Sequence, residues 1–241
     1  NNNLNGTYYL AASLNANEIE LENGASSYIN GTFTGKLIGS KDGKNYAIYN
    51  LKKPLFNTLS AATVENLTLK DVNISGKSDI GALANEANNA TRINNVHVDG
   101  VLAGERGIGG LAWKADNSKI TNSSFKGRII NSYETRSPYN IGGLVGQLTG
   151  INAVVDKSKA TIAISSNADS TNQTVGGLAG LVEKDALISN SYAEGHINNV
   201  KRFGSVAGIA GYLWDRDSSE ERHPGRLHNV LSDVNVMNGN A

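Results

Sequence analysis

The stretch Asn140–Leu148 reads "NIGGLVGQL", and its glycine–leucine phrase recurs along the chain. Related phrases are "DIGALANEA" at 79–87, "GIGGLAWKA" at 107–115, "TVGGLAGLV" at 174–182 and "SVAGIAGYL" at 205–213. A catalytic glycine loop is needed once, whereas an architecture can use the same piece many times. Five copies in 241 residues therefore favour a repeated structural unit.

The repeated unit keeps its phrase but varies in length. The residue after the second small position is Leu83, Leu111, Leu144, Leu178 or Ile209, so the successive gaps are 28, 33, 34 and 31 residues. In the copies with the full phrase, the glycines permit a bend or a close approach of neighbouring backbone, and the aliphatic residue fills a core. These structural positions are Gly143, Leu144, Gly146, Gly177, Leu178, Gly180, Gly208, Ile209 and Gly211. The unequal gaps predict loops of variable length within a constant unit.

A second phrase alternates with the first. Its copies are "VENLTL" (64–69), "RINNVHV" (92–98), "KITNSSF" (119–125), "VVDKSKA" (154–160), "LISNSYA" (187–193) and "RLHNVLS" (226–232). Its key position is occupied by Asn66, Asn95, Asn122, Lys157, Asn190 and Asn229. Asparagine tolerates the left-handed backbone region and hydrogen-bonds nearby groups, so this column predicts a strand that bends at a corner. We also expect the amides to bond one another along the stack.

A unit of this size, interpreted as two short strands and a loop, cannot bury its apolar face alone. The sequence therefore predicts an all-β fold: a right-handed parallel β-helix (solenoid) with about 28–34 residues per coil and inserted loops. A propeller is disfavoured because each unit lacks four recognisable strands. We expect one domain over residues 1–241, with 1–55 as opening coils or an N-terminal cap and 56–241 as repeated coils.

Composition narrows the function. The 22 basic residues offset 22 acidic ones and are scattered, so neither nucleic acid nor an anionic membrane is expected as a partner. The absence of cysteine removes disulfides and thiolate chemistry. No apolar run approaches the roughly 18 residues that a membrane helix needs. Because the chain opens on "NNNLNG" and stops on "NGNA", we expect it to be a domain of something longer.

Catalytic patterns are not recognisable in this sequence. The four histidines, His97, His196, His223 and His228, have no partner at metal-binding spacing. The carboxylates Asp71, Asp99, Asp156 and Glu194 fall at different repeat positions, which disfavours a β-helix polysaccharide-active enzyme but leaves it as a third alternative. No helical pattern follows the glycine runs, so they are not phosphate loops. We therefore expect no catalytic, metal or cofactor-binding residue in this chain.

Two insertions are candidates for partner contact, because long loops on a rigid scaffold often carry binding. "YLWDRDSSEERHPGR" (212–226) contributes Trp214, Asp215, Arg216, Asp217, Glu220 and Arg222. "IINSYETRSPYN" (129–140) contributes Tyr133, Arg136 and Tyr139. The alternative for the first insertion is a solvated loop that covers a solenoid end, with Trp214 packed over the last core layer.

The full phrases Gly143–Gly146 and Gly177–Gly180, with an isoleucine version at Gly208–Gly211, resemble the GLUG repeat of Gram-positive surface proteins. The segments "GTFTGKLIGS" (31–40) and "NYAIYNLKKPLF" (45–56) are similar to the region that often precedes it. Within that group, the chain most resembles the region upstream of the catalytic domain in streptococcal immunoglobulin A1 proteases and related surface zinc metalloproteases. The resemblance extends over most of the chain from about Gly31 onward.

This resemblance implies an extracellular, cell-wall-anchored or secreted parent whose zinc site lies outside this chain. The chain would be a monomeric, non-catalytic scaffold or substrate-recognition domain, with immunoglobulin A1 and the parent's own catalytic domain as partners. The alternative is an adhesin module that binds host glycan or protein.

Overall fold

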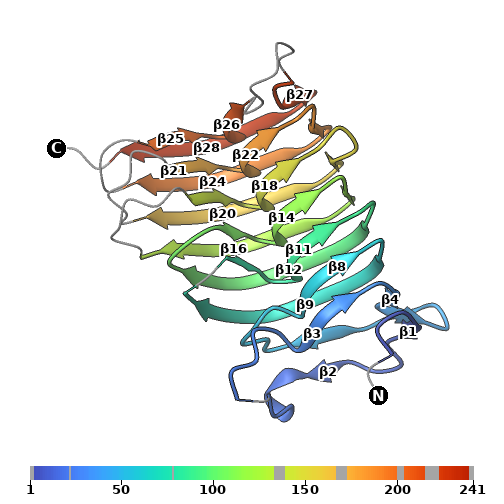
Figure 1. The fold of residues 1–241 in the computed structure, drawn as a ribbon. Coiled ribbons are helices and arrows are strands. Elements are labelled where there is room, and N and C mark those ends of the chain that lie inside the picture. The colour runs from blue at the N-terminus through green and yellow to red at the C-terminus, as the bar shows by residue number, and fades with distance from the viewer. Residues whose placement is uncertain are drawn as a thin grey trace.

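The computed structural model describes residues 3–21, 23–77, 79–132, 139–166, 173–199, 204–214 and 223–238. Within these ranges the chain is built from short strands, and its one helix is the three-residue 3-10 helix η1 (Ala16–Glu18). Successive coils stack on one another from the N-terminal to the C-terminal end (Figure 1). The all-β parallel β-helix that the repeats predict is confirmed.

Equivalent strands of successive coils pair in parallel and form long sheets. A five-stranded sheet contains β10 (Ile80–Gly81), β13 (Ile108–Gly109), β17 (Tyr139–Gly142), β21 (Gln173–Gly176) and β25 (Gly204–Ala207). A seven-stranded sheet contains β3 (Ile29–Phe33), β8 (Phe56–Ser60), β11 (Ala84–Asn88), β14 (Ala112–Asp116), β18 (Val145–Thr149), β22 (Ala179–Glu183) and β26 (Ala210–Trp214). The glycine–leucine phrase is the link between these two sheets in the five coils that contribute a strand to both.

The third, 14-stranded sheet passes around the asparagine corner. Before the corner lie β15 (Lys119–Thr121), β19 (Val154–Asp156), β23 (Leu187–Ser189) and β27 (Arg226–His228), and after it lie β16 (Ser124–Asn131), β20 (Lys159–Ser166), β24 (Tyr192–Asn199) and β28 (Leu231–Asn238). The long strands β9 (Thr63–Gly76) and β12 (Arg92–Gly104) run through the corner without a break. Each regular coil therefore has four strand segments rather than the expected two. The start of the 129–140 insertion, residues 129–131, belongs to strand β16 because neighbouring coils supply its hydrogen-bond partners on both sides.

The corner prediction is confirmed in all six copies. Their φ angles are 55° at Asn66, 54° at Asn95, 50° at Asn122, 47° at Lys157, 47° at Asn190 and 48° at Asn229, all in the left-handed region. Lys157 shows that the backbone conformation is imposed by the coil, since lysine has no special tolerance for it.

The predicted amide ladder is only partly continuous. Asn95 Nδ2 donates to Asn66 Oδ1 at 2.8 Å, and Asn229 Nδ2 donates to Asn190 Oδ1 at 2.8 Å. Asn122 instead donates to Asn94 Oδ1, and Asn190 donates to Asp156 Oδ1, each at 2.8 Å. The ladder is thus shared with the column just before the corner. Lys157, which has no amide, interrupts the corner column itself.

A column of buried serines lies just inside the corner, and sequence analysis missed it. Ser123 and Ser158 accept from the backbone N–H one coil earlier, of Val96 and Ser123 respectively, each at 3.1 Å. The next step repeats this contact, with Ser158 N–H donating to Ser191 Oγ at 3.1 Å. Each hydroxyl also donates to a carbonyl two residues earlier in its own coil. The serines therefore satisfy backbone groups that the left-handed corner diverts from the strand ladder.

Glycine is required in the phrase because backbones meet there, as predicted. A Cβ added at Gly142 would lie 1.9 Å from Val145 O and 2.7 Å from Ala179 Cα. At Gly143 it would lie 2.1 Å from Gly177 O. These contacts are far inside van der Waals distance, so the tight link between the two sheets excludes any side chain.

A single aliphatic core runs along the solenoid axis. In the column two residues before the corner, Ile93, Ile120, Val155 and Ile188 are each 0% exposed and lie in parallel register. Stacking closes the core because each coil covers the apolar face of its neighbour.

The N-terminal part is less regular. It contains β1 (Thr7–Tyr9), β2 (Leu14–Asn15), β4 (Lys36–Ile38) and β7 (Ala47–Tyr49), of which β4 and β7 pair with β9. β5 (Ser40–Lys41) and β6 (Lys44–Asn45) form an antiparallel hairpin. Division of the chain into an opening part and repeated coils within one domain stays a prediction.

Candidate interaction surfaces

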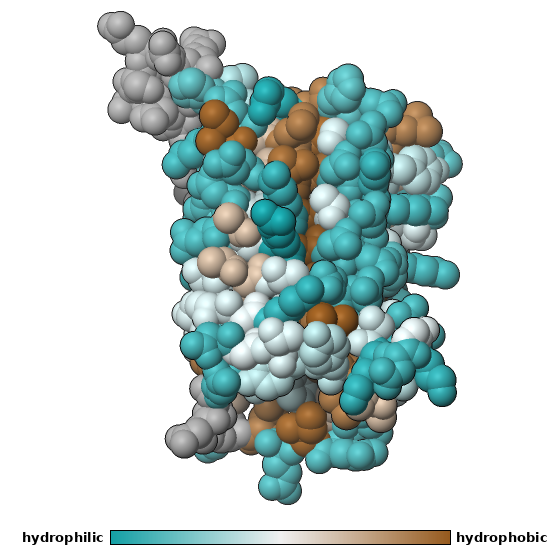
Figure 2. Space-filling view, turned by 90° about the vertical axis from the view of Figure 1, so that its right-hand side faces the viewer, coloured by the Kyte–Doolittle hydropathy of each residue, from teal (hydrophilic) through white to brown (hydrophobic). Residues whose placement is uncertain are grey.

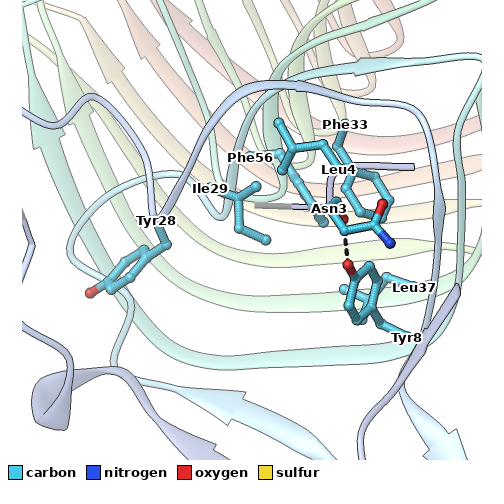
Figure 3. A pocket seen from close by; sticks show the side chains of 8 residues that line it. All are labelled: Asn3, Leu4, Tyr8, Tyr28, Ile29, Phe33, Leu37 and Phe56. Carbon is cyan, nitrogen blue, oxygen red and sulfur yellow. Dashed lines mark hydrogen bonds between the residues drawn. The ribbon is translucent and has the colours of Figure 1, made fainter. Parts of the chain in front are cut away.

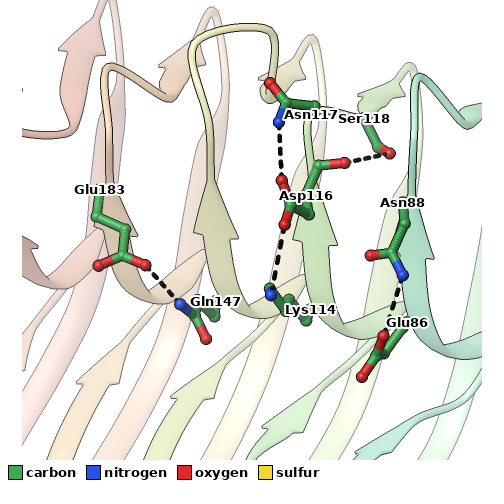
Figure 4. Close-up of polar contacts among 8 residues, drawn as sticks. All are labelled: Glu86, Asn88, Lys114, Asp116, Asn117, Ser118, Gln147 and Glu183. Carbon is green, nitrogen blue, oxygen red and sulfur yellow. Dashed lines mark hydrogen bonds and ion pairs between the residues drawn. The ribbon is translucent and has the colours of Figure 1, made fainter.

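The outer face of the seven-stranded sheet carries polar side chains that pair within each coil (Figure 4). On β11, Asn88 Nδ2 donates to Glu86 Oε2 at 3.0 Å. On β14, Lys114 Nζ lies 3.4 Å from Asp116 Oδ2, and Asn117 Nδ2 donates to Asp116 Oδ1 at 2.9 Å. These neighbours satisfy one another's hydrogen bonds, which gives the polar side chains here a structural role.

The same face becomes aromatic toward the C-terminal end. Gln147 Nε2 donates across the coils to Glu183 Oε1 at 2.6 Å (Figure 4). One coil further, β26 places Tyr212 and Trp214 on this face, with ring centroids 4.9 Å apart. Tyr212 is 38% and Trp214 39% exposed, so the pair forms an accessible aromatic patch.

Trp214 lies outside the core layer. It and Tyr212 alternate along β26 with Leu213, which stacks in register on the fully buried Val182. Since neighbouring strand residues point to opposite faces, Trp214 points outward. The alternative in which Trp214 packs over the last core layer is therefore wrong.

The end of the 212–226 insertion is fixed to the corner between β22 and β23. His223 Nδ1 lies 2.7 Å from Asp185 Oδ2, and the Asp185 N–H donates to His223 O at 3.1 Å. Arg226 donates through Nε and Nη2 to Asp185 O at 3.1 and 2.8 Å. A Cβ on Gly225 would lie 2.5 Å from Val182 O, so the chain presses closely on the coil below. The insertion is thus anchored beside the aromatic patch.

Most of the other candidate contact residues lie outside the described residues. These are Asp215, Arg216, Asp217, Glu220 and Arg222 in the first insertion, and Tyr133 and Arg136 in the second. Tyr139 is described, and its expected role at a surface is wrong. It begins β17 and is 2% exposed, because its position faces the core where the coil re-enters the five-stranded sheet.

Asp71 and Asp99 lie in neighbouring coils and are linked through a backbone group. The side chain of Asp99 accepts from the Asp71 N–H at 2.9 Å, at a register shift between β12 and β9. Asp71 has a φ of 53°, so this bond supports another left-handed residue. The contact has a structural role, because it holds the backbone at Asp71, and it brings no acid and base together.

His97 is occupied by structural hydrogen bonds. Its Nε2 lies 2.9 Å from Asn95 Oδ1 and its Nδ1 lies 2.8 Å from Ser124 Oγ. Burial lowers the pKa of His97, which favours its neutral form. Among the described residues, no three His, Cys, Asp or Glu side chains gather as a metal site would require.

An apolar cavity of about 300 Å³ lies at the N-terminal end of the solenoid (Figure 3). Its lining residues are Asn3, Leu4, Tyr8, Tyr28, Ile29, Phe33, Leu37 and Phe56. The Tyr8 hydroxyl donates to Asn3 O, and the Phe33 and Phe56 rings lie 4.9 Å apart. None of the lining side chains is charged at neutral pH, so the cavity offers packing surface rather than catalytic groups.

The described part of the chain has no helix with the length and apolar character needed to cross a membrane. The view in Figure 2 shows a mainly hydrophilic face with a narrow hydrophobic band, as expected for coils whose apolar side chains point inward.

Fold and repeats together define the class: a parallel β-solenoid built from GLUG units. The profile described as the GLUG motif matches residues 104–130 and 171–198, and residues 1–100 match "M26 IgA1-specific Metallo-endopeptidase N-terminal region". The chain belongs to the GLUG-repeat region of the streptococcal immunoglobulin A1 protease family, which confirms the resemblance drawn from its sequence.

Individual relatives agree with this assignment. An immunoglobulin A1 protease of Streptococcus sanguinis is 93% identical over the whole chain, and one of Streptococcus pneumoniae is 72% identical. The zinc metalloprotease ZmpC of Streptococcus pneumoniae is 44% identical over 98% of the chain. The chain spans only 13%, 12% and 12% of these three relatives.

Solved structures share the fold. A structure named IgA1 Protease has a TM-score of 0.91 and 69% identity, covering 99% of this chain and 19% of its own. A Bacteroides ovatus structure with 19% identity has a TM-score of 0.68 over 95% of this chain and 78% of its own, and it shows the fold alone.

Proposed function

We propose that this chain is the non-catalytic β-solenoid scaffold of an extracellular, streptococcal-type metalloprotease that cleaves immunoglobulin A1. It positions the catalytic domain, the antibody substrate, or both. The observation that carries the proposal is the 93% identity to a Streptococcus sanguinis immunoglobulin A1 protease, together with the parallel stack of coils. The zinc ion and its ligands then belong to another part of the longer protein.

Rigidity supports the scaffold role. Neighbouring coils are joined by continuous parallel strand pairing, by the corner amides and by the serine column. A rigid rod holds distant surfaces in fixed geometry, which lowers the entropic cost of binding a partner there.

The aromatic patch supports a recognition role. Tyr212 and Trp214 are side-chain types enriched at interaction hot spots, and they lie beside an insertion whose end is fastened to Asp185. Their place near the C-terminal end of the solenoid gives a partner an accessible platform.

The test is a binding titration of the chain with purified human immunoglobulin A1 and, separately, with the catalytic region of the Streptococcus sanguinis relative. The proposal expects saturable binding to at least one of them, weakened at least tenfold by Trp214→Ala. Tyr9→Ala is the matched control, because Tyr9 is 56% exposed at the opposite end. Binding to neither partner by the folded chain overturns the positioning role.

The adhesin alternative predicts a different result in the same experiment. An adhesin module binds a host glycan or matrix protein and neither antibody nor catalytic region. The enzyme alternative predicts turnover of a polysaccharide by this chain alone. A glycan array and a reducing-sugar assay, run on the same preparation, separate these outcomes from the proposed function.

A further inference from the structure

The two ends of the solenoid are built differently. At the N-terminal end, Phe33 and Phe56 are 3% and 0% exposed, and their rings lie 4.9 Å apart with an interplanar angle of 40°. The first two strands there, β1 and β2, are only three and two residues long and η1 follows β2, whereas β3, which carries Phe33, has five residues. At the C-terminal end the last coil repeats the pattern of the coils before it (Figure 1).

The last coil leaves a row of strand edges open. β25 pairs with β21, β26 with β22, β27 with β23 and β28 with β24. Among the described residues, none of these four strands has a partner on its other side. Such an edge is a template for another strand.

Core columns also reach this end without a cover. Val182 is 0% exposed, whereas Leu213, its partner in the last coil, is 40% exposed. Ile188 is 0% exposed, whereas Leu227 above it is 38% exposed. The inward position is the same in each pair, so the difference comes from the missing layer above.

The hydrogen bonds of the corner side chains all run in one direction along the stack. The side-chain amides of Asn95, Asn122, Asn190 and Asn229 all donate toward the preceding coil, as Asn229 Nδ2 does to Asn190 Oδ1 at 2.8 Å. Asn229 Oδ1 accepts no hydrogen bond from the described residues. It therefore presents an acceptor toward the next layer, suited to another asparagine amide.

We propose that this end receives one further parallel β-coil, contributed by the same polypeptide in proteins as long as the relatives. That coil places aliphatic side chains over Leu213 and Leu227 and a side-chain donor over Asn229. The relatives supply the chain for it, since the matched segment is only 13% of the Streptococcus sanguinis protein. The proposal is independent of what the longer protein cleaves.

A second copy of the chain does not fit this end as well. Head-to-tail stacking would bring the open edges against the short, interrupted strands β1 and β2. Tail-to-tail stacking about a two-fold axis would oppose the strand directions and lose the parallel register that every other coil keeps.

Hydrogen exchange tests the proposal. The 241-residue chain is compared with the same chain extended by the forty or so residues that follow the matched segment in the Streptococcus sanguinis relative. We expect amides of β26, β27 and β28 to exchange at least tenfold more slowly in the extended chain, with β16 unchanged as internal control. Equal exchange of these strands in the two chains overturns the proposal.

Leu227→Lys makes the test specific for the end layer. In the extended chain it should abolish the added protection of β27 and β28, and in the 241-residue chain it should leave exchange within twofold. If β27 and β28 of the extended chain keep their slower exchange after Leu227→Lys, the added coil does not pack over Leu227 and the proposal is wrong. Sedimentation supplies the remaining outcome: a dimer of the 241-residue chain that Leu227→Lys dissociates would make a second copy the occupant and overturn the proposal.

Discussion

Asn95 and Asn66, one coil apart, are joined by an amide hydrogen bond of 2.8 Å while both hold left-handed φ angles, 54° and 55°. The same side chain thus relieves a backbone constraint and links two coils. Asn95 Oδ1 also lies 2.9 Å from His97 Nε2, so the corner amide is bonded on both sides.

Replacing Asn95 separates these two contributions. Asn95→Ala should lower the free energy of unfolding by about 2 kcal/mol, since a left-handed alanine costs roughly 1–2 kcal/mol and a hydrogen bond contributes about 1 kcal/mol. Asn95→Gly loses only the hydrogen bonds, because glycine adopts this φ freely. Urea unfolding of the three proteins measures the difference. Equal losses for alanine and glycine would show that the backbone conformation carries no strain.

At the equivalent corner of another coil, replacing Lys157 should raise the free energy of unfolding. Its φ is 47° although lysine has no preference for that region, so Lys157→Asn should stabilise the protein by about 0.5–1 kcal/mol. This corresponds to a rise in melting temperature of roughly 2–4 °C per kcal/mol for a chain of this size. Lys157→Gln is the control, because it removes the same charge without the tolerance of asparagine. A gain shared by both variants would point to charge instead.

The corners and the glycine links are the parts of the fold that the sequence predicts most directly. The asparagine column and the glycine phrase were visible because each demands one residue type at a fixed place: left-handed backbone for Asn95, backbone contact for Gly142. The serine column was not visible, since serine is common in loops and its value lies in hydrogen bonds between coils. The insertion predicted at 129–140 begins with strand residues 129–131, because strand partners 27 to 35 residues away define that strand and its own pattern does not.

The interaction surface was harder to predict than the fold. Trp214 was recognised as a contact candidate by residue type, but its outward position follows from the register of Leu213 on Val182. Tyr139 was misplaced for the same reason. Its type suggests a surface contact, whereas its position at the start of β17 buries it.

Ser158 tests the hydrogen-bonded column inside the corner. Ser158→Ala removes the acceptor for the Ser123 N–H, which is buried, so the free energy of unfolding should fall by about 1–3 kcal/mol. Ser75→Ala is the matched control on an exposed position of β9 and should change it by less than about 0.5 kcal/mol. Chemical denaturation monitored by circular dichroism measures both. A Ser158→Ala variant as stable as the control would mean that water replaces the hydroxyl.

Gly142 and Gly43 separate steric from conformational needs for glycine. A Cβ at Gly142 would lie 1.9 Å from Val145 O, whereas Gly43 has a φ of 74° and open space around its Cβ direction. Gly43→Ala should therefore cost only about 1 kcal/mol. Gly142→Ala has to push two coils apart and should cost several times more, about 4 kcal/mol or loss of folding. Thermal unfolding and soluble yield distinguish the two. Similar behaviour of both variants would contradict the close approach.

Asp79 should make the protein less stable as the pH rises, which is the opposite of the usual effect of a carboxylate. Burial raises the pKa of Asp79, and the Gly107 N–H at 2.8 Å and the Arg106 guanidinium at 3.9 Å oppose that rise. Because the folded pKa lies above the unfolded value, the stability that this group contributes is present below pH about 4 and is lost as pH rises through the folded pKa. Asp79→Asn keeps an oxygen for Gly107 and removes the charge. It should therefore be more stable than the natural protein at pH 7, with the difference vanishing near pH 3.

Asp79→Ala completes this test. It also removes the charge, but it leaves the Gly107 N–H without its acceptor, so it should be less stable than Asp79→Asn at every pH. Melting temperatures of the three proteins between pH 3 and 8 give the comparison. If Asp79→Asn were destabilising at pH 7, attraction to Arg106 would outweigh burial and the folded pKa of Asp79 would lie below its ordinary value. The stability difference between Asp79→Asn and the natural protein at pH 7 therefore has a diagnostic sign. A positive difference means that burial of the charged carboxylate destabilises the coil. A negative one means that its ion pair with Arg106 stabilises the contact between β10 and the next coil.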